Sequence, residues 1–179
     1  MNIIIPMARR GTRLRPHTLT IPKPLVPIAG KPIVERLVED IVKVCNGPVD
    51  NIGFIIDRGF GEEVENELEV IADSAGSRGH VYYQDEKLGT AHAILCAQTM
   101  LEGNVVVAFA DTLFQADFVL DNSKDGIIWV QQVDDPSSFG VVEVNNNNVI
   151  TGFVEKPQDP VSDLTIIGIY YIRLGEFLR

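Results

Sequence analysis

The sequence of 179 residues has only two cysteines, and Cys45 and Cys96 do not have the spacing of a metal-binding pair. Two cysteines are too few for a disulfide framework, so we expect both to be reduced thiols in the core. No run of about eighteen apolar residues occurs, which argues against a transmembrane helix. The apolar run at the N-terminus precedes the cations, the reverse of a secretory signal. A cytoplasmic protein is expected.

Acidic residues outnumber basic ones, and the formal net charge of −10 argues against a nucleic-acid partner or a membrane surface. The first 34 residues, however, contain no Asp or Glu. Glycine, proline and threonine are interleaved with the cations of this stretch, which predicts a long loop at 7–31 that holds an anion. A solvated basic loop is the alternative. The cations are Arg9, Arg10, Arg13, Arg15, Lys23 and Lys31.

Short apolar runs alternate with amphipathic helical patterns as far as residue 110, which is typical of a doubly wound α/β fold. Strands are expected at 2–6, 52–56, 80–83 and 104–110, and helices at 32–45, 62–75 and 90–100. Consecutive strands then follow at 126–133, 140–144, 149–155 and 164–172. The length suits one domain. The chain is therefore predicted to be a single three-layer, Rossmann-like α/β domain with a mixed central sheet.

Polar segments follow three of the expected parallel strands. They are the 7–31 loop, the 84–90 loop and Asp111. Ligands of open α/β sheets bind at the carboxyl ends of the strands, so we expect these segments to face one crevice. The first loop has neither the Walker A spacing nor G-x-G-x-x-G, which excludes these two generic nucleotide sites.

Seven short motifs occur in order along the chain. They are GTRLRP at 11–16, PKP at 22–24, GKP at 30–32, QxxxLGTAHA at 84–93, AD at 110–111, FG at 139–140 and EKP at 155–157. With them the chain resembles the sugar-1-phosphate nucleotidyltransferases, the family of glucose-1-phosphate thymidylyltransferase and related pyrophosphorylases. The resemblance implies the nucleotide-diphospho-sugar transferase fold, with its C-terminal part missing here.

The resemblance also implies a reaction in which a nucleoside triphosphate and a sugar 1-phosphate give a nucleotide-sugar and pyrophosphate. Joining two polyanions requires positioning and charge neutralisation. By resemblance, Arg13 would stabilise the departing pyrophosphate and Lys23 would offset charge at the attacked phosphate. The sugar phosphate oxygen would be the nucleophile. A surface salt bridge is the alternative for both cations, and the two alternatives are evenly balanced for Arg15 and Lys31.

The amide of Gln84 can donate to one base atom and accept from its neighbour, which suits the N3–H and O4 edge of uracil or thymine. A pyrimidine triphosphate, dTTP or UTP, is therefore expected. Thr90 is also expected to cap the following helix. His92 is expected to be a packed or capping histidine and is assigned no role. The nucleotide-binding residues implied by the resemblance are Ala8, Gly11, Thr12, Gln84, Gly89 and Thr90.

Asp111 follows a strand with no charged residue, where an unpaired carboxylate would be costly to desolvate. By resemblance Asp111 binds Mg²⁺, and a turn or helix-cap aspartate is the alternative. Gly140 would contact the hexose through its backbone, Glu155 would accept from the hexose hydroxyls, and Lys156 would bind the phosphate. An exposed hairpin pair is the alternative for Glu155 and Lys156. The expected acceptor is a hexose 1-phosphate, with glucose 1-phosphate preferred.

Two features depart from the family pattern. Arg9 stands where the family usually has a glycine, and the family's second metal-binding aspartate would lie beyond residue 179. A non-catalytic homologue that binds a nucleotide or sugar phosphate is therefore a second hypothesis. A third is the N-terminal uridylyltransferase module of a bifunctional acyltransferase. The strand at 164–172 is expected to keep one flank uncovered, which predicts a homo-oligomer or a poorly behaved monomer.

Overall fold

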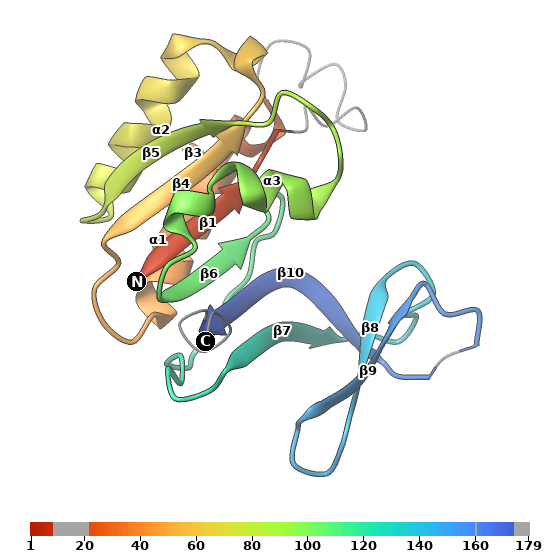
Figure 1. Ribbon diagram of the computed structural model, residues 1–179. Helices are drawn as coiled ribbons and strands as arrows, with labels where there is room; N and C mark the ends of the chain where they lie inside the picture. The colour runs from red at the N-terminus through yellow and green to blue at the C-terminus, as the bar shows by residue number, and fades with distance from the viewer. Residues whose placement is uncertain (9–21, 160, 174–179) are drawn as a thin grey trace.

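A mixed sheet of eight strands organises the computed structural model, which describes residues 1–8, 22–159 and 161–173 (Figure 1). The strand order is β5-β4-β1-β6-β10-β8-β9, and β7 pairs with β10. β5, β4, β1 and β6 run parallel, whereas β10 is antiparallel to β6, β7 and β8. The bounds are β1 (Asn2–Pro6), β4 (Asn51–Ile56), β5 (Arg78–Tyr83), β6 (Asn104–Ala108), β7 (Gly126–Gln132), β8 (Gly140–Val144), β9 (Ile150–Glu155) and β10 (Leu164–Arg173).

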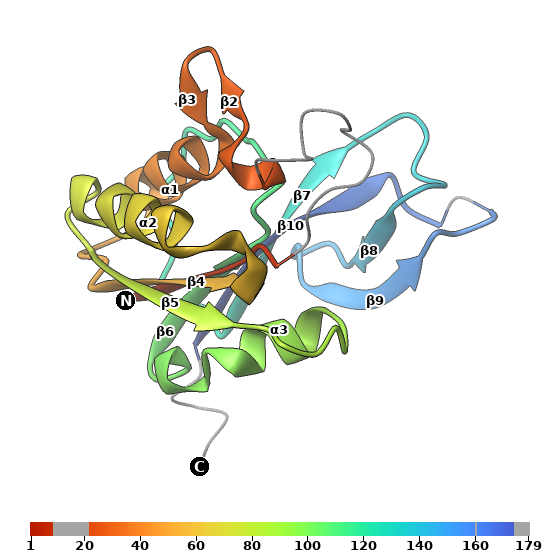
Figure 2. The same ribbon diagram turned by 90° about the horizontal axis from the view of Figure 1, so that it is seen from above.

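Helices cover both faces of the parallel half of the sheet. α1 (Ile33–Val44) and α2 (Glu62–Ser74) lie on one face and α3 (Thr90–Cys96) on the other (Figure 2). In β1, Ile3 and Ile5 belong to the apolar cluster under α1 and α2, and Ile4 belongs to the cluster under α3. Successive strand side chains point to opposite faces, so a strand that is apolar throughout is buried on both. The three-layer prediction is confirmed.

Two predicted elements are shorter than expected. The helix at 90–100 ends at Cys96, and a 3₁₀ turn, η5 (Gln98–Met100), follows after Ala97. The strand at 104–110 ends at Ala108, because a turn in which the Thr112 amide donates to the Phe109 carbonyl begins immediately afterwards. None of the helices in the described ranges has the length and apolar character that crossing a bilayer requires.

The described part of the 7–31 segment is not an irregular loop throughout. A 3₁₀ turn, η3 (Lys23–Leu25), precedes a short hairpin of β2 (Pro27–Ile28) and β3 (Lys31–Pro32). Ala29 and Gly30 both have positive φ, 49° and 79°, which is the geometry of a two-residue type I′ turn. The guanidinium of Arg36 in α1 donates to the carbonyl of Ile28 at 2.7 Å and so holds the hairpin to the helix.

The prediction of an uncovered flank on the strand at 164–172 is wrong. β10 pairs with β6 and β8 on one side and with β7 on the other, so both of its flanks are hydrogen-bonded. The register with β7 shifts between Ile166 and Tyr170, which marks an irregularity in β10. The homo-oligomer loses the structural reason that suggested it and stays only a prediction.

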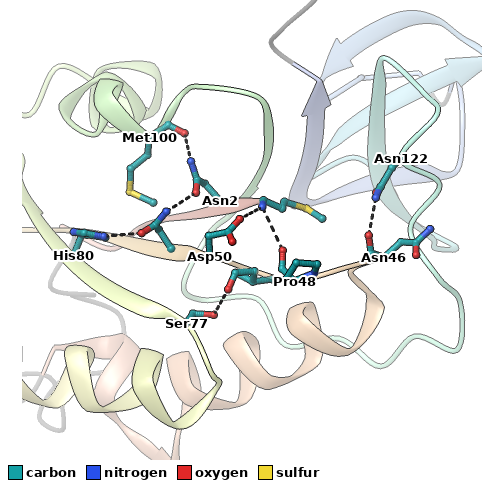
Figure 3. Close-up of polar contacts among 11 residues, drawn as sticks. Asn2, Asn46, Pro48, Asp50, Ser77, His80, Met100 and Asn122 are labelled. Atoms are coloured by element: carbon teal, nitrogen blue, oxygen red, sulfur yellow. Dashed lines mark hydrogen bonds and ion pairs between the residues drawn. The ribbon is translucent and has the colours of Figure 1, made fainter.

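Polar side chains at the amino ends of the parallel strands bond to one another (Figure 3). The Asn51 amide donates to the Oδ1 atom of Asn2 at 2.9 Å, and His80 Nε2 lies 2.9 Å from the Oδ1 atom of Asn51. The N-terminal ammonium of Met1 pairs with the carboxylate of Asp50 and holds the pKa of Asp50 below its usual value. These polar groups of β1, β4 and β5 therefore have partners at the amino edge.

The close approach of α2 to β5 gives a test of the packing. A Cβ added at Gly79 would lie 2.9 Å from the Cα atom of Glu69 and 3.2 Å from the Cβ atom of Ala72. Gly79→Ala is expected to lower the free energy of unfolding by about 1–3 kcal/mol, because the helix backbone must move away. Urea unfolding measures this change.

Gly126→Ala is the matched control, since its nearest contact would be the Tyr171 carbonyl at 3.5 Å. We expect the control to lie within about 0.5 kcal/mol of the wild type. Equal stability of the two variants would show that α2 does not contact β5 as closely as described.

Candidate active site

The carboxyl ends of the parallel strands place several of the predicted residues along one edge of the sheet. Ala8 follows β1, Gln84 follows β5 and Asp111 follows β6. β1 pairs with β6 directly, and β4 lies between β1 and β5; since all four strands are parallel, their carboxyl ends lie along the same edge. Gly11, Thr12 and Arg13, and with them the other arginines of the basic stretch, lie outside the described residues.

An ion pair joins two predicted site residues that are 88 positions apart. Lys23 Nζ lies 2.9 Å from the Oδ2 atom of Asp111. The lysine side chain is 29% exposed and the aspartate side chain 57% exposed, so both groups remain accessible to a ligand. The pair brings the predicted phosphate-binding cation next to the predicted magnesium ligand.

η3 fixes the position of Lys23. Within this turn the Leu25 amide donates to the Pro22 carbonyl at 2.9 Å, and the Val26 amide donates to the Lys23 carbonyl at 3.1 Å. Leu25 is 5% exposed and belongs to the core cluster under α1. Burial of this leucine anchors the turn, while the lysine that begins it stays at the surface.

The irregularity in β10 holds the turn that carries Asp111. Thr112 Oγ1 donates to the carbonyl of Ile167 at 2.8 Å, and the Phe109 amide donates to the carbonyl of Gly168 at 3.0 Å. Gly168 has φ 82°, and a Cβ there would lie 3.0 Å from Phe109 Cδ2. Asp111 itself is exposed because the chain turns outward after the buried Ala110, and its carboxylate has the cation Lys23 as a partner.

The 84–90 loop closes on the side chain of Gln84, which is 9% exposed. Gln84 Nε2 donates to the Gly89 carbonyl at 3.0 Å and lies 3.3 Å from His92 Nδ1. Gly89 has φ 99° and is the N-cap of α3 without a side-chain cap, so the expected capping role of Thr90 is wrong: Thr90 is the first helical residue. The contact between His92 and Gln84 was missed, although their spacing in one motif hinted at it.

The predicted sugar-binding residues lie together at the base of the β8–β9 hairpin. Gly140 and Glu155 are paired across the two strands, and a Cβ at Gly140 would lie 2.9 Å from the Oε2 atom of Glu155. Lys156 Nζ lies 3.5 Å from the Oε1 atom of Glu155, and both side chains are exposed. Lys156 has φ 47°, and its amide donates to the Phe139 carbonyl at 3.0 Å.

Tyr170 of β10, which the sequence analysis missed, packs beside the strand end that precedes Asp111 and is influenced by the charge of Glu155. Its ring meets Phe109 edge-on at 6.2 Å between centroids. Burial, and secondarily the negative charge of Glu155, raise the pKa of the Tyr170 hydroxyl. The sequence could not predict these neighbours of Tyr170, because they come from other strands and a tyrosine within an apolar strand pattern does not indicate them.

Two other groups considered in the sequence analysis, Lys31 and Cys45, have surroundings that do not indicate a role in the site. Lys31 Nζ lies 2.6 Å from Glu39 Oε1 and 3.4 Å from Glu35 Oε1, and the hydrogen bond to Glu39 raises the pKa of the lysine. This favours the salt-bridge alternative for Lys31. Burial raises the pKa of Cys45 to about 11, so this free thiol is no nucleophile at neutral pH.

The chain matches the family model for nucleotidyl transferases over residues 4–177. A bifunctional protein GlmU of Methanococcus aeolicus is 36% identical over 174 residues, which cover 95% of this chain and 39% of the relative. The catalytic subunit beta of a mannose-1-phosphate guanylyltransferase of Drosophila melanogaster is 36% identical over 170 residues, covering 89% of this chain and 45% of the relative. The chain thus spans less than half the length of these relatives.

Solved structures share the fold. A structure assigned to a glucose-1-phosphate thymidylyltransferase of Bacillus anthracis, in complex with a sucrose, superposes with a TM-score of 0.80 at 25% identity, covering 99% of this chain and 73% of the other. A UDP-glucose pyrophosphorylase complexed with UDP-glucose superposes with a TM-score of 0.76 at 25% identity, covering 99% and 77%. The expected nucleotide-diphospho-sugar transferase fold is confirmed.

The hydrogen bond from Thr112 to β10 is expected to contribute to the stability of the turn that carries Asp111. Thr112→Val removes the donor to the Ile167 carbonyl and is expected to lower the free energy of unfolding by about 1 kcal/mol. Thr112→Ser keeps the hydroxyl and should retain most of the stability. Chemical unfolding of the two variants measures the difference, and a valine variant as stable as the serine variant would contradict the anchoring role.

Proposed function

The chain belongs to the nucleotidyl transferase family, and from this membership we propose that it transfers a nucleotidyl group from dTTP or UTP to a hexose 1-phosphate, preferably glucose 1-phosphate. Pyrophosphate would be the second product. The observation that carries the proposal is the 2.9 Å ion pair of Lys23 and Asp111. It places a cation and an anion suited to phosphate chemistry at the carboxyl edge of the sheet.

In this reaction the protein would have to neutralise charge on the phosphates, and no protein side chain would have to act as the nucleophile. A phosphate oxygen of the sugar phosphate attacks the α-phosphorus of the triphosphate, and the bond to pyrophosphate breaks. Lys23 would donate hydrogen bonds to the attacked phosphate, where negative charge accumulates. Arg13 would stabilise the departing pyrophosphate, and the backbone at Ala8, Gly11 and Thr12 would hold the triphosphate. Lys156 would bind the phosphate of the sugar.

Mg²⁺ is the proposed cofactor, and Asp111 would be its protein ligand. The described residues contain no group of three or more His, Cys, Asp or Glu side chains placed to hold a metal ion. An exposed single carboxylate fits Mg²⁺ better than a metal that needs a full protein cage, because Mg²⁺ retains water and binds substrate phosphates. When bound, the cation would supply further neutralisation of phosphate charge.

The sugar end supports a hexose acceptor. A Cβ at Gly140 would lie 2.9 Å from the Glu155 carboxylate and 3.7 Å from Ile166 Cδ1, so the carboxylate lies close to the Gly140 backbone. There it can accept hydrogen bonds from sugar hydroxyls. Lys156 lies beside this carboxylate. A hydroxyl-rich ring with a phosphate would therefore meet one acceptor and one cation on neighbouring residues.

Pyrophosphate release with Mg²⁺, dTTP or UTP and glucose 1-phosphate tests the proposal. We expect Lys23→Met and Asp111→Asn each to lower kcat/KM by about 100-fold or more. The first removes the cation that would neutralise the attacked phosphate, and the second removes the carboxylate that would hold Mg²⁺. Lys31→Met is the matched control: this lysine pairs with α1 and should leave kcat/KM within about twofold.

Full activity of Asp111→Asn would reject the metal assignment. Nucleotide binding without pyrophosphate release in the wild type would favour the non-catalytic homologue. Neither binding nor release with any triphosphate would reject the proposed function itself.

The ion pair also predicts competition for Asp111. A divalent cation that binds this carboxylate must displace Lys23 or tolerate its positive charge. Lys23→Met is therefore expected to tighten Mn²⁺ binding in the absence of nucleotide by about twofold to fivefold at low salt, and Asp111→Asn to weaken it. Electron paramagnetic resonance of free Mn²⁺ measures both changes, and unchanged affinity in Lys23→Met would contradict the competition.

A further inference from the structure

The amide nitrogen of Gln84 has two potential acceptors within reach inside the protein. Its Nε2 atom donates to the Gly89 carbonyl at 3.0 Å and lies 3.3 Å from the ring nitrogen Nδ1 of His92. A glutamine amide has two N–H donors and one carbonyl acceptor. If each N–H of Gln84 donates to one of these two atoms, no N–H remains to donate to a ligand. The carbonyl oxygen of the amide can then still accept a hydrogen bond from a base, but the expected donation to the base is lost.

The orientation of the amide follows from its surroundings. The Gly89 carbonyl accepts from Gln84 Nε2 and also from the Ala93 amide at 3.2 Å, so it faces donors on both sides. Reversing the amide would bring Oε1 to about hydrogen-bond distance from this carbonyl, and two acceptors would then face each other. In the part of the chain that the structure describes, no group donates to the Oε1 atom of Gln84.

His92 completes this arrangement from the first turn of α3. Its Nδ1 atom can accept the second amide hydrogen only when the ring proton is on Nε2. The neighbouring Ala93 is 4% exposed and packs in the cluster under α3, which fixes the helical turn from which the His92 side chain extends. The histidine thus occupies the one N–H that could otherwise turn toward a base.

We propose that His92 is a positioning residue that keeps the carbonyl oxygen of Gln84 as the only open polar atom of this amide, so that the site selects bases with a ring N–H. The inference rests on the proposed function. Uracil and thymine carry N3–H, which this oxygen accepts. Cytosine has an unprotonated N3 at the same place, so its lone pair would face the carbonyl oxygen. Among purines, guanine has a ring N–H on its pairing edge and adenine does not.

Dissociation constants of UTP and CTP, measured by isothermal titration, test this selection. The wild type should prefer UTP. His92→Leu removes the acceptor while keeping an apolar side chain, which frees the amide to turn and donate to cytosine. We expect the preference for UTP over CTP to fall about tenfold in this variant, since a lost or mismatched buried hydrogen bond has an effect of this size.

His92→Asn keeps an acceptor near the place of Nδ1 and should retain the preference within about threefold. His80→Leu is the matched control: this histidine bonds Asn51 at the amino edge and should leave the preference unchanged. GTP and ATP in the same titrations extend the test, and GTP should bind the wild type more tightly than ATP.

The tautomer of His92 distinguishes the proposed role from a purely structural one, because only the proposed role requires the ring proton to be on Nε2. Nitrogen-15 NMR should show the Nε2–H form for the ring signal that disappears in His92→Asn. An Nδ1–H form, or a UTP preference unchanged in His92→Leu, would overturn the proposal and leave the proposed function standing. A wild type that binds no nucleoside triphosphate would overturn both.

Discussion

Burial of the parallel strands on both faces is the constraint on which the rest of the structure depends. Ile3, Ile4 and Ile5 of β1 are fully buried, two against α1 and α2 and one against the layer of α3. Such strands cannot carry charge along their length, so polar groups collect at their ends. At the amino ends these groups bond to one another, whereas at the carboxyl ends Asp111 stays exposed and, among the described residues, forms an ion pair with Lys23. The sheet therefore offers its chemistry at one edge.

The pair of Lys23 and Asp111 suits exchange with a ligand rather than stability. Half-exposed ion pairs contribute at most about 1 kcal/mol, because water already solvates both charges. A polyphosphate could take the place of Asp111 beside Lys23, and a divalent cation could take the place of Lys23 beside Asp111. Little stability would be lost, because the ion pair itself contributes little. Lys31 differs, since Glu35 and Glu39 of α1 both contact it and hold it to the helix. Two lysines of one basic stretch thus have different partners, Lys23 at the carboxyl edge of the sheet and Lys31 on α1.

Periodicity predicted the strands, the layers and the edge that carries the site, because burial on both faces leaves a plain apolar pattern. It could not predict the end of α3, where the chain changes to a 3₁₀ turn after Cys96 without a proline or glycine to mark it. The hairpin at Ala29 and Gly30 is too short for any periodic signal. The pairing of β10 on both flanks and the contact of Tyr170 with Phe109 involve segments far apart in the sequence. The contact of His92 with Gln84 depends on side-chain orientation, which a sequence pattern does not indicate.

The parts of the site differ in how firmly the fold holds them. Gln84 and Asp111 follow strands in the buried half of the sheet, and hydrogen bonds from their own loops fix them further. Gly140, Glu155 and Lys156 lie on the β8–β9 hairpin, which pairs with β10 at one position, Thr165 with Val141. Rigid elements hold a ligand more accurately than elements with few attachments. The proposed nucleotide end would therefore be organised before binding, and the relative placement of sugar and nucleotide would come in part from substrates that contact both ends at once.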